Sequence, residues 1–123
     1  MRKYYGNDPK IIIVEPTKAP VLLESINKGE AVTVTGGVSN MGRLDCKSPS
    51  TRALSSLAIT CTNFMTIEDK DADIGVEELK QNGFATSPSG GAGYAAIKEA
   101  KKYSDSGIDK NSKILIILTE KPA

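Results

Sequence analysis

Residues 11–14 read Ile-Ile-Ile-Val, follow the turn-forming stretch Asn7-Asp8-Pro9, and continue directly into Glu15-Pro16. β-Branched residues bounded by turn formers are typical of a strand. Because all four positions are apolar, we expect both faces of this strand to be covered, as in a parallel sheet that lies between helices. The stretch therefore predicts an α/β fold.

Outward from this strand, further strand-like and helix-like segments alternate along the chain. The other expected strands are Ala31–Thr35, Phe64–Ile67 and Ile114–Leu118. Apolar spacing and capping residues predict helices over Pro20–Lys28, Ser50–Ile59, Lys70–Gln81 and Gly91–Tyr103, and Phe84–Ser87 has the length of a further short strand. This order predicts a three-layer α/β/α fold with a mostly parallel sheet, formed by residues 1–123 as a single α/β domain or domain fragment.

Composition excludes several classes of function. The 123 residues carry 16 basic and 15 acidic side chains, so the net charge of +1 offers no electrostatic attraction to nucleic acid or to an anionic membrane. No histidine is present, which excludes histidine general-base chemistry and histidine metal sites within these residues. Cys46 and Cys61 lack metal-site spacing and are interpreted as two reduced thiols of a cytoplasmic protein, with a disulfide between them left open.

Three segments have the chemistry of a ligand site, and each also has a purely structural explanation. Thr86–Gly93 is rich in small residues and leads into an expected helix, so it suits either close approach of an anion or a tight loop capped by Ser89. The polar loop Gly36–Cys46 either converges on a small ligand or is an ordinary surface loop. Glu15 ends the first strand, where α/β sheets place ligand-binding groups, but it also suits capping of the next turn.

Four motifs occur in an order that resembles one enzyme family. They are Ile13–Ala19 (IVEPTKA), Gly36-Gly37, Gly42–Pro49 (GRLDCKSP) and Ser87–Ala92 (SPSGGA). Together they are similar to the C-terminal part of fold-type II pyridoxal-phosphate-dependent enzymes, the tryptophan synthase β-like superfamily, and most similar to its diaminopropionate ammonia-lyases. The resemblance implies a lyase that acts on a small amino acid by α,β-elimination.

The resemblance also implies which residues contact pyridoxal 5'-phosphate. Ser89 matches the serine that hydrogen-bonds the pyridine nitrogen of the cofactor, and a neutral hydroxyl cannot hold that nitrogen protonated as a carboxylate does. A weaker electron sink suits elimination, in which the leaving group departs promptly. The cofactor-binding residues expected on this basis are Ser89, Gly90, Gly91, Gly36, Gly37 and Glu15.

Two parts that such an enzyme needs are not recognisable in residues 1–123. In the family, a Schiff-base lysine and a glycine-rich phosphate loop precede the region seen here. The resemblance therefore implies that these residues are inactive alone, and no catalytic residue is assigned to them. We expect the chain to form a homo-oligomer or to pair with a missing N-terminal part.

Two further expectations follow from departures from the family pattern. Some relatives bind a divalent cation through positions that correspond here to Glu15, Ala19 and Val21, and because the Val21 side chain offers no oxygen we predict no metal. The alternative to an enzyme segment is a non-catalytic small α/β module that binds a ligand or a partner and derives from the same fold.

Overall fold

Two parallel strands form the centre of the fold in a computed structural model that describes residues 1–100 and 106–122. The strands are β1 (Ile12–Pro16) and β2 (Asn63–Ile67), paired in the register Ile12 to Asn63 through Pro16 to Ile67. The helices are α1 (Arg2–Tyr5), α2 (Val21–Lys28), α3 (Thr51–Thr60), α4 (Asp69–Gln81) and α5 (Pro88–Ala100). The predicted α/β fold with a parallel sheet is confirmed.

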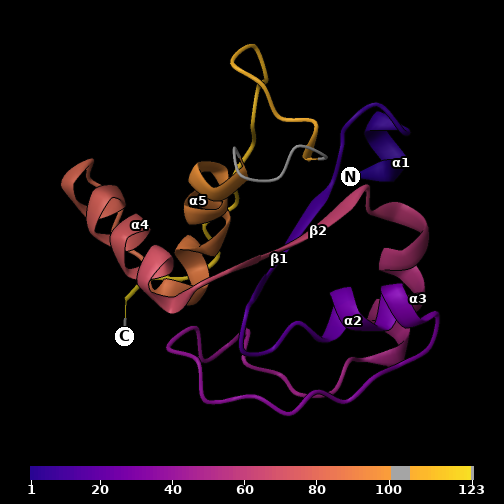
Figure 1. Cartoon of the computed structure of the whole chain (residues 1–123). Helices are drawn as coiled ribbons and strands as arrows, with labels where there is room; N and C mark the ends of the chain where they lie inside the picture. The colour runs from indigo at the N-terminus through magenta and orange to yellow at the C-terminus, as the bar shows by residue number, and fades with distance from the viewer. Residues whose placement is uncertain (101–105, 123) are drawn as a thin grey trace.

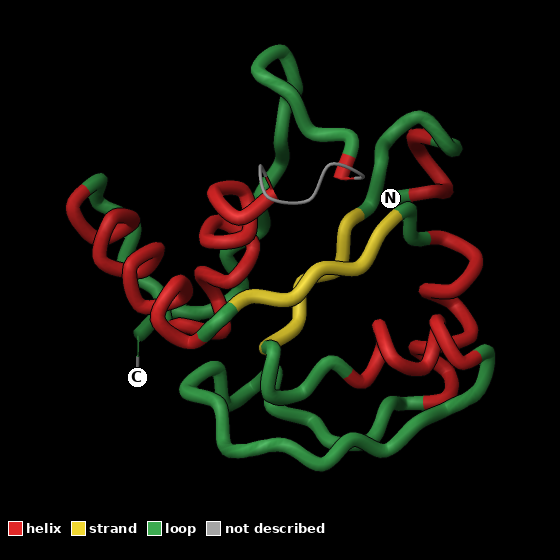
Figure 2. Tube along the Cα trace, in the orientation of Figure 1, coloured by secondary structure: helices red, strands yellow, loops and turns green. Residues whose placement is uncertain are grey.

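Helices lie on both sides of the sheet. Figures 1 and 2 show α4 and α5 on one side of the two strands and α2 and α3 on the other. The crossover from β1 to β2 contains α2, α3 and the long loop between them, as parallel pairing requires. The sheet therefore has the two covering layers that the apolar strand at residues 11–14 predicts.

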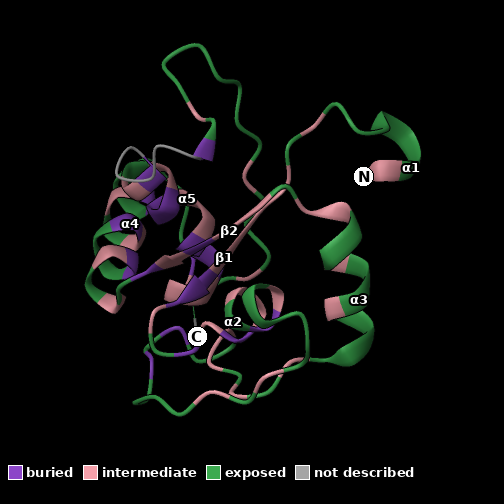
Figure 3. Ribbon diagram, turned by 45° about the vertical axis from the view of Figure 1, so that its right-hand side comes forward, coloured by how far each residue is buried: buried purple, intermediate pink, exposed green. Residues whose placement is uncertain are grey.

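The core lies between the sheet and the pair of helices α4 and α5. Its buried residues are Met41, Ile67, Ala72, Ala92, Ala95 and Ala96, with Val14 and Leu44 packed against them. Small residues let the two helices approach closely, since a Cβ added to Gly75 of α4 would lie 3.0 Å from the Cβ of Ala95. Figure 3 shows buried residues concentrated here, whereas α3 has none.

Helix ends follow the capping signals in the sequence. The Ser50 hydroxyl accepts a hydrogen bond from Ala53 N at 3.3 Å and caps α3, and Gly29 ends α2 with a positive φ of 75°. The acidic residues Asp69 and Asp71 lie in the first turn of α4, where they complement the helix dipole. Helix α5 begins at Pro88 rather than Gly91, and the last three residues of the predicted Gly91–Tyr103 helix lie outside the described residues.

Three predicted strands are wrong. Ala31–Thr35, Ile114–Leu118 and the short segment Phe84–Ser87 are irregular in the structure. Strand propensity is realised only where a neighbouring strand pairs with the segment. Val34 donates one backbone hydrogen bond to Lys47 O at 2.9 Å, which links two parts of a loop and builds no ladder.

Two other sequence expectations concern the cysteines and the membrane. Both thiols are free, with Cys46 exposed and Cys61 half-buried. Within residues 1–100 and 106–122, no helix has the length and apolar character needed to cross a bilayer.

Candidate functional site

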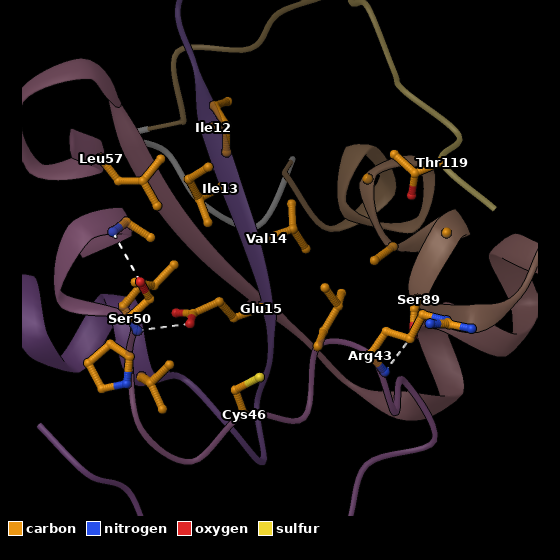
Figure 4. Close-up of a pocket in the computed structure, with 18 of the residues that line it drawn as sticks. Ile12, Ile13, Val14, Glu15, Arg43, Cys46, Ser50, Leu57, Ser89 and Thr119 are labelled. Atoms are coloured by element: carbon orange, nitrogen blue, oxygen red, sulfur yellow. Dashed lines mark hydrogen bonds between the residues drawn. The ribbon is translucent and has the colours of Figure 1, made fainter. Parts of the chain in front are cut away.

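A cavity of about 490 Å³ opens beside β1 and brings together three of the residues expected to bind the cofactor. Ser89 and Gly90, from the first turn of α5, and Glu15, near the end of β1, all line it. Figure 4 shows Ser89 and Arg43 on one side of β1, and Ser50 and Leu57 on the other. The segment Arg43–Cys46 of the long loop contributes Arg43, Leu44 and Cys46 to the wall.

The Ser89 hydroxyl is held by the long loop. Its oxygen accepts a hydrogen bond from the backbone N–H of Arg43 at 3.1 Å, and the side chain is half-buried at the cavity wall. A hydroxyl that accepts one hydrogen bond still carries a proton to donate. Ser89 is therefore oriented as a neutral donor to an acceptor atom in the cavity.

Glu15 has a structural task in addition to its place in the cavity. Its two carboxylate oxygens accept hydrogen bonds from Leu22 N at 2.8 Å and Leu23 N at 2.9 Å, and the residue is buried. Pro20, the N-cap of α2, provides no side-chain cap, so the carboxylate supplies it from β1. The alternative interpretation of Glu15 as a cap is confirmed, and its contact with the cofactor stays a prediction.

Glu15 should also make stability depend on pH. Burial raises the pKa of its carboxyl group above the ordinary value, although the N–H groups of Leu22 and Leu23 act in the opposite direction. Because the folded chain holds this proton more tightly, the contribution of Glu15 to stability is present at low pH and is lost as pH rises through the folded pKa. We expect the free energy of unfolding of the wild type, minus that of Glu15→Gln, to decrease between about pH 4 and about pH 7 in urea titrations. A difference that stays constant or increases with pH would contradict this assignment.

Gly91, Gly36 and Gly37 do not line the cavity. Gly91 faces α4, where an added Cβ would lie 3.1 Å from Cγ2 of Val76. A Cβ on Gly36 would collide with the backbone carbonyl of Lys18, and Gly37 accepts a hydrogen bond from Lys47 Nζ at 2.8 Å. These glycines permit close packing of the chain against itself, and their contact with the cofactor stays a prediction.

Ion pairs fix the long loop to the beginning of α4. Asp69 accepts hydrogen bonds from Lys18 Nζ at 2.8 Å and from the Ser39 hydroxyl at 2.5 Å, and these contacts hold the pKa of its carboxyl group below the usual value. Lys47 Nζ in turn contacts Asp45 at 2.5 Å. The loop is thus held in place at the carboxyl end of the sheet, on the same side as Ser89.

Loss of the Asp69 contacts should loosen this loop. In Asp69→Asn we expect faster amide exchange at Met41, whose N–H donates to the Ser39 hydroxyl at 3.1 Å, because that hydroxyl loses its anionic acceptor. Site-resolved hydrogen exchange by NMR measures the effect. Glu30→Gln is the matched control, since the exposed Lys28–Glu30 pair should leave Met41 unchanged. Equal exchange at Met41 in the Asp69→Asn variant and the wild type would contradict the prediction.

Arg43 and Glu120 are site residues whose pairing the sequence analysis missed. Arg43 Nε lies 2.6 Å from the Glu120 carboxylate, which also accepts a hydrogen bond from the Ser87 hydroxyl. Thr86 Oγ1 donates to the backbone oxygen of Glu120 at 2.8 Å. These contacts tie the C-terminal segment to the loop that precedes Ser89. No spacing rule links residues so distant along the chain, so the pairing becomes visible only in the fold.

The family model described as "Pyridoxal-phosphate dependent enzyme" matches residues 1–120. The chain belongs to this pyridoxal-phosphate-dependent enzyme family. Members of the family use pyridoxal phosphate, and the match accounts for the ordered motifs that run from Ile13 to Ala92. A search of curated proteins gave no match.

Solved structures show the same fold. The chain is similar to maize serine racemase (TM-score 0.84, 20% identity, 97% of this chain and 37% of that one) and to a fungal L-serine ammonia-lyase from Rhizomucor miehei (0.81, 16%, 98% and 39%). It is also similar to a threonine deaminase whose source is given as T.th. (0.75, 16%, 83% and 38%). The chain thus spans less than two fifths of the length of each of these proteins.

The residues around Ser89 fit one edge of the cofactor of this family. An oriented, neutral hydroxyl suits an unprotonated pyridine nitrogen, which accepts a hydrogen bond. The nearby Glu120 carboxylate is occupied by Arg43 and Ser87. Within the described residues, no three acidic or cysteine side chains gather as a metal site would require. The donor set therefore matches the ring nitrogen and does not supply a charged partner for it.

Proposed function

We propose that the chain is part of a lyase that eliminates ammonia or water from a small amino acid with pyridoxal phosphate, in the manner of a diaminopropionate ammonia-lyase. The family match supports the cofactor, and two of the similar solved structures are named as an ammonia-lyase and a deaminase. Serine and threonine, which appear in those names, both carry a leaving group on Cβ. No observation favours the alternative of a non-catalytic module.

The Ser89 hydroxyl carries this proposal. Since its oxygen accepts from Arg43 N, its proton is available to the ring nitrogen of a cofactor that lies against the first turn of α5. Pyridoxal phosphate supplies an electron sink for carbanion chemistry. A hydroxyl partner leaves the ring nitrogen uncharged, which moderates that sink and favours prompt loss of the leaving group at Cβ.

The neighbouring residues set the distance and the surroundings of that contact. An added Cβ on Gly90 would collide with the Thr86 hydroxyl, so Gly90 lets the first turn of α5 pack directly against the segment that carries Glu120. Glu15 keeps the beginning of α2 in place on the other side of the cavity. In this proposal the chain's own residues bind and orient the ring, and do not themselves move the substrate proton.

The covalent link and the phosphate site must then come from elsewhere. No lysine of residues 1–123 lies in a motif that resembles the family's Schiff-base lysine. We propose that polypeptide outside these residues supplies this lysine and the glycine-rich phosphate loop, either in a longer chain or in an assembly.

Borohydride trapping tests this division of labour. Residues 1–123 are mixed with pyridoxal phosphate, reduced with borohydride, digested, and mapped by mass spectrometry, with pyridoxine 5'-phosphate as the competitor that lacks an aldehyde. We expect labelling spread over exposed lysines such as Lys28 and Lys80, with no site protected by the competitor. Specific labelling of one lysine, with ammonia released from diaminopropionate, would show that these residues already hold the complete site.

A further inference from the structure

The cavity beside β1 has an unusual relation to the strand that borders it. Ile12, Ile13, Val14 and Glu15 all line it, and no residue of β2 does. Successive side chains of a strand point to opposite faces of the sheet, so four consecutive residues cannot line a cavity that covers one face. The cavity therefore lies beside the open edge of β1 and reaches both faces of the sheet.

The other walls agree with this position. One covering layer contributes Val21, Leu22, Ala53 and Leu57 from α2 and α3, and the opposite layer contributes Ser89, Gly90, Ala92 and Gly93 from α5. Ile117 and Thr119 of the C-terminal segment complete the lining. Figure 4 shows Leu57 and Thr119 on opposite sides of β1, so the cavity extends through the thickness of the sandwich.

Backbone groups of β1 point into this space. Thr17 N donates to Ile67 O at 3.0 Å, and Ile11 O accepts from Thr62 N at 2.7 Å, so the odd-numbered residues of this stretch direct their backbone groups toward β2. Because these directions alternate along a strand, Ile12 and Val14 direct their N–H and C=O groups toward the cavity. A strand edge that faces a largely apolar cavity needs hydrogen-bonding partners.

We propose that this cavity is a strand position of the sheet and that it takes an extended polypeptide segment from outside residues 1–123. The segment would pair with Ile12 and Val14 on one edge, lie alongside residues 115–119 on the other, and carry apolar side chains on both faces. The lining beside Ile12–Val14 is apolar on both sides, which suits a strand of this kind and does not suit a polar ligand.

Two further observations support this occupant. Ile114–Leu118 has the composition of a strand yet is irregular, and Leu115 and Ile117 are 78% and 63% exposed, as expected of a strand that lacks its neighbour. The solved proteins with this fold are much longer than the matched region, which is 37–39% of each, so they have ample additional chain to provide one. Ser89 lies level with Glu15, nearer the carboxyl end of β1 (Figure 4), so a strand beside Ile12–Val14 leaves the Ser89 end of the cavity open.

Site-resolved amide exchange tests the proposal on residues 1–123. The probe is a capped heptapeptide of five valine and isoleucine residues between two lysines, and its control carries N-methyl groups on alternate amides, which block pairing along one edge. We expect exchange at Ile12 and Val14 to be fast without the peptide and to slow by about tenfold or more with it. Exchange at Ile13 and Glu15, which face β2, should change little, and the methylated control should protect neither pair.

Matched variants connect the effect with the cavity. Ala53→Phe places a large side chain in the cavity and should abolish the protection, whereas Ser56→Phe on the same helix lies outside the cavity lining and should not. Slow exchange at Ile12 and Val14 in the free chain at every concentration would overturn the proposal, as would protection that is equal in Ala53→Phe and Ser56→Phe. Protection that grows with chain concentration alone would also overturn it, since a second copy would then be the occupant.

Discussion

Replacement of Ser89 by Ala is expected to weaken the binding of pyridoxine 5'-phosphate by about tenfold, because a partly buried hydrogen bond to the ring contributes roughly 1–1.5 kcal/mol. The ligand has no aldehyde, so the measurement reports non-covalent contacts alone. The Arg43 N–H, which donates to Ser89 at 3.1 Å, lies on an exposed loop residue and is free to bind water in the variant. The loss should therefore reflect the ring contact, measured by NMR titration of the full chain.

Ser48→Ala is the control for this variant. Ser48 lines the same cavity, but its hydroxyl is hydrogen-bonded to Thr33 Oγ1 at 2.9 Å, so it has a partner elsewhere in the chain. We expect the affinity of Ser48→Ala for the ligand to stay within about twofold of the wild type, as for a substitution away from the contact. Equal losses in both variants would mean that the cavity wall, and not the Ser89 hydroxyl, determines binding.

Replacement of Gly90 by Ala should lower the free energy of unfolding by about 2 kcal/mol, because the added methyl group has no space. A Cβ there would collide with Thr86 Oγ1 and lie 2.9 Å from Cγ of Glu120. Thr86 donates to Glu120 O at 2.8 Å, so the methyl group also disturbs the contact that holds the C-terminal segment. Urea unfolding followed by circular dichroism measures the change.

Gly93→Ala is the matched control on the same helix. Its added Cβ would lie 3.5 Å from Cγ2 of Ile116, an ordinary van der Waals contact. Alanine is favoured over glycine within a helix by up to about 1 kcal/mol, so this variant should be as stable as the wild type or more so. Destabilisation of the same size in both variants would show that the close packing at Gly90 has no special effect.

The fold could be predicted from the sequence where local signals decide it. Apolar residues at 11–14 and the caps of α2 and α3 specify elements without reference to distant parts of the chain. Ala31–Thr35 and Ile114–Leu118 have equally strong strand composition, but neither has a strand beside it within the described residues. Pairing partners, unlike propensity, are not encoded in the segment itself.

The site shows the same division. The hydroxyl at Ser89 and the small residue at Gly90 could be predicted from the motif, and both line the cavity. Gly36 was predicted in the same way but packs against Lys18, because a glycine that permits close approach does not reveal what approaches it. The Arg43–Glu120 pair joins distant parts of the chain by ordinary charges, and no motif distinguishes those charges from others on the surface.

The nitrogen-15 chemical shift of the pyridine ring of bound, labelled pyridoxine 5'-phosphate tests the role of Ser89 most directly. With the wild-type chain at neutral pH, the account predicts an unprotonated, hydrogen-bonded ring nitrogen, and in Ser89→Asp it predicts a protonated one, since a carboxylate stabilises the charged ring. In Ser89→Ala the hydrogen-bonded shift should be lost. The same ring-nitrogen shift in the wild type, Ser89→Ala and Ser89→Asp would contradict the claim that the Ser89 hydroxyl contacts this atom.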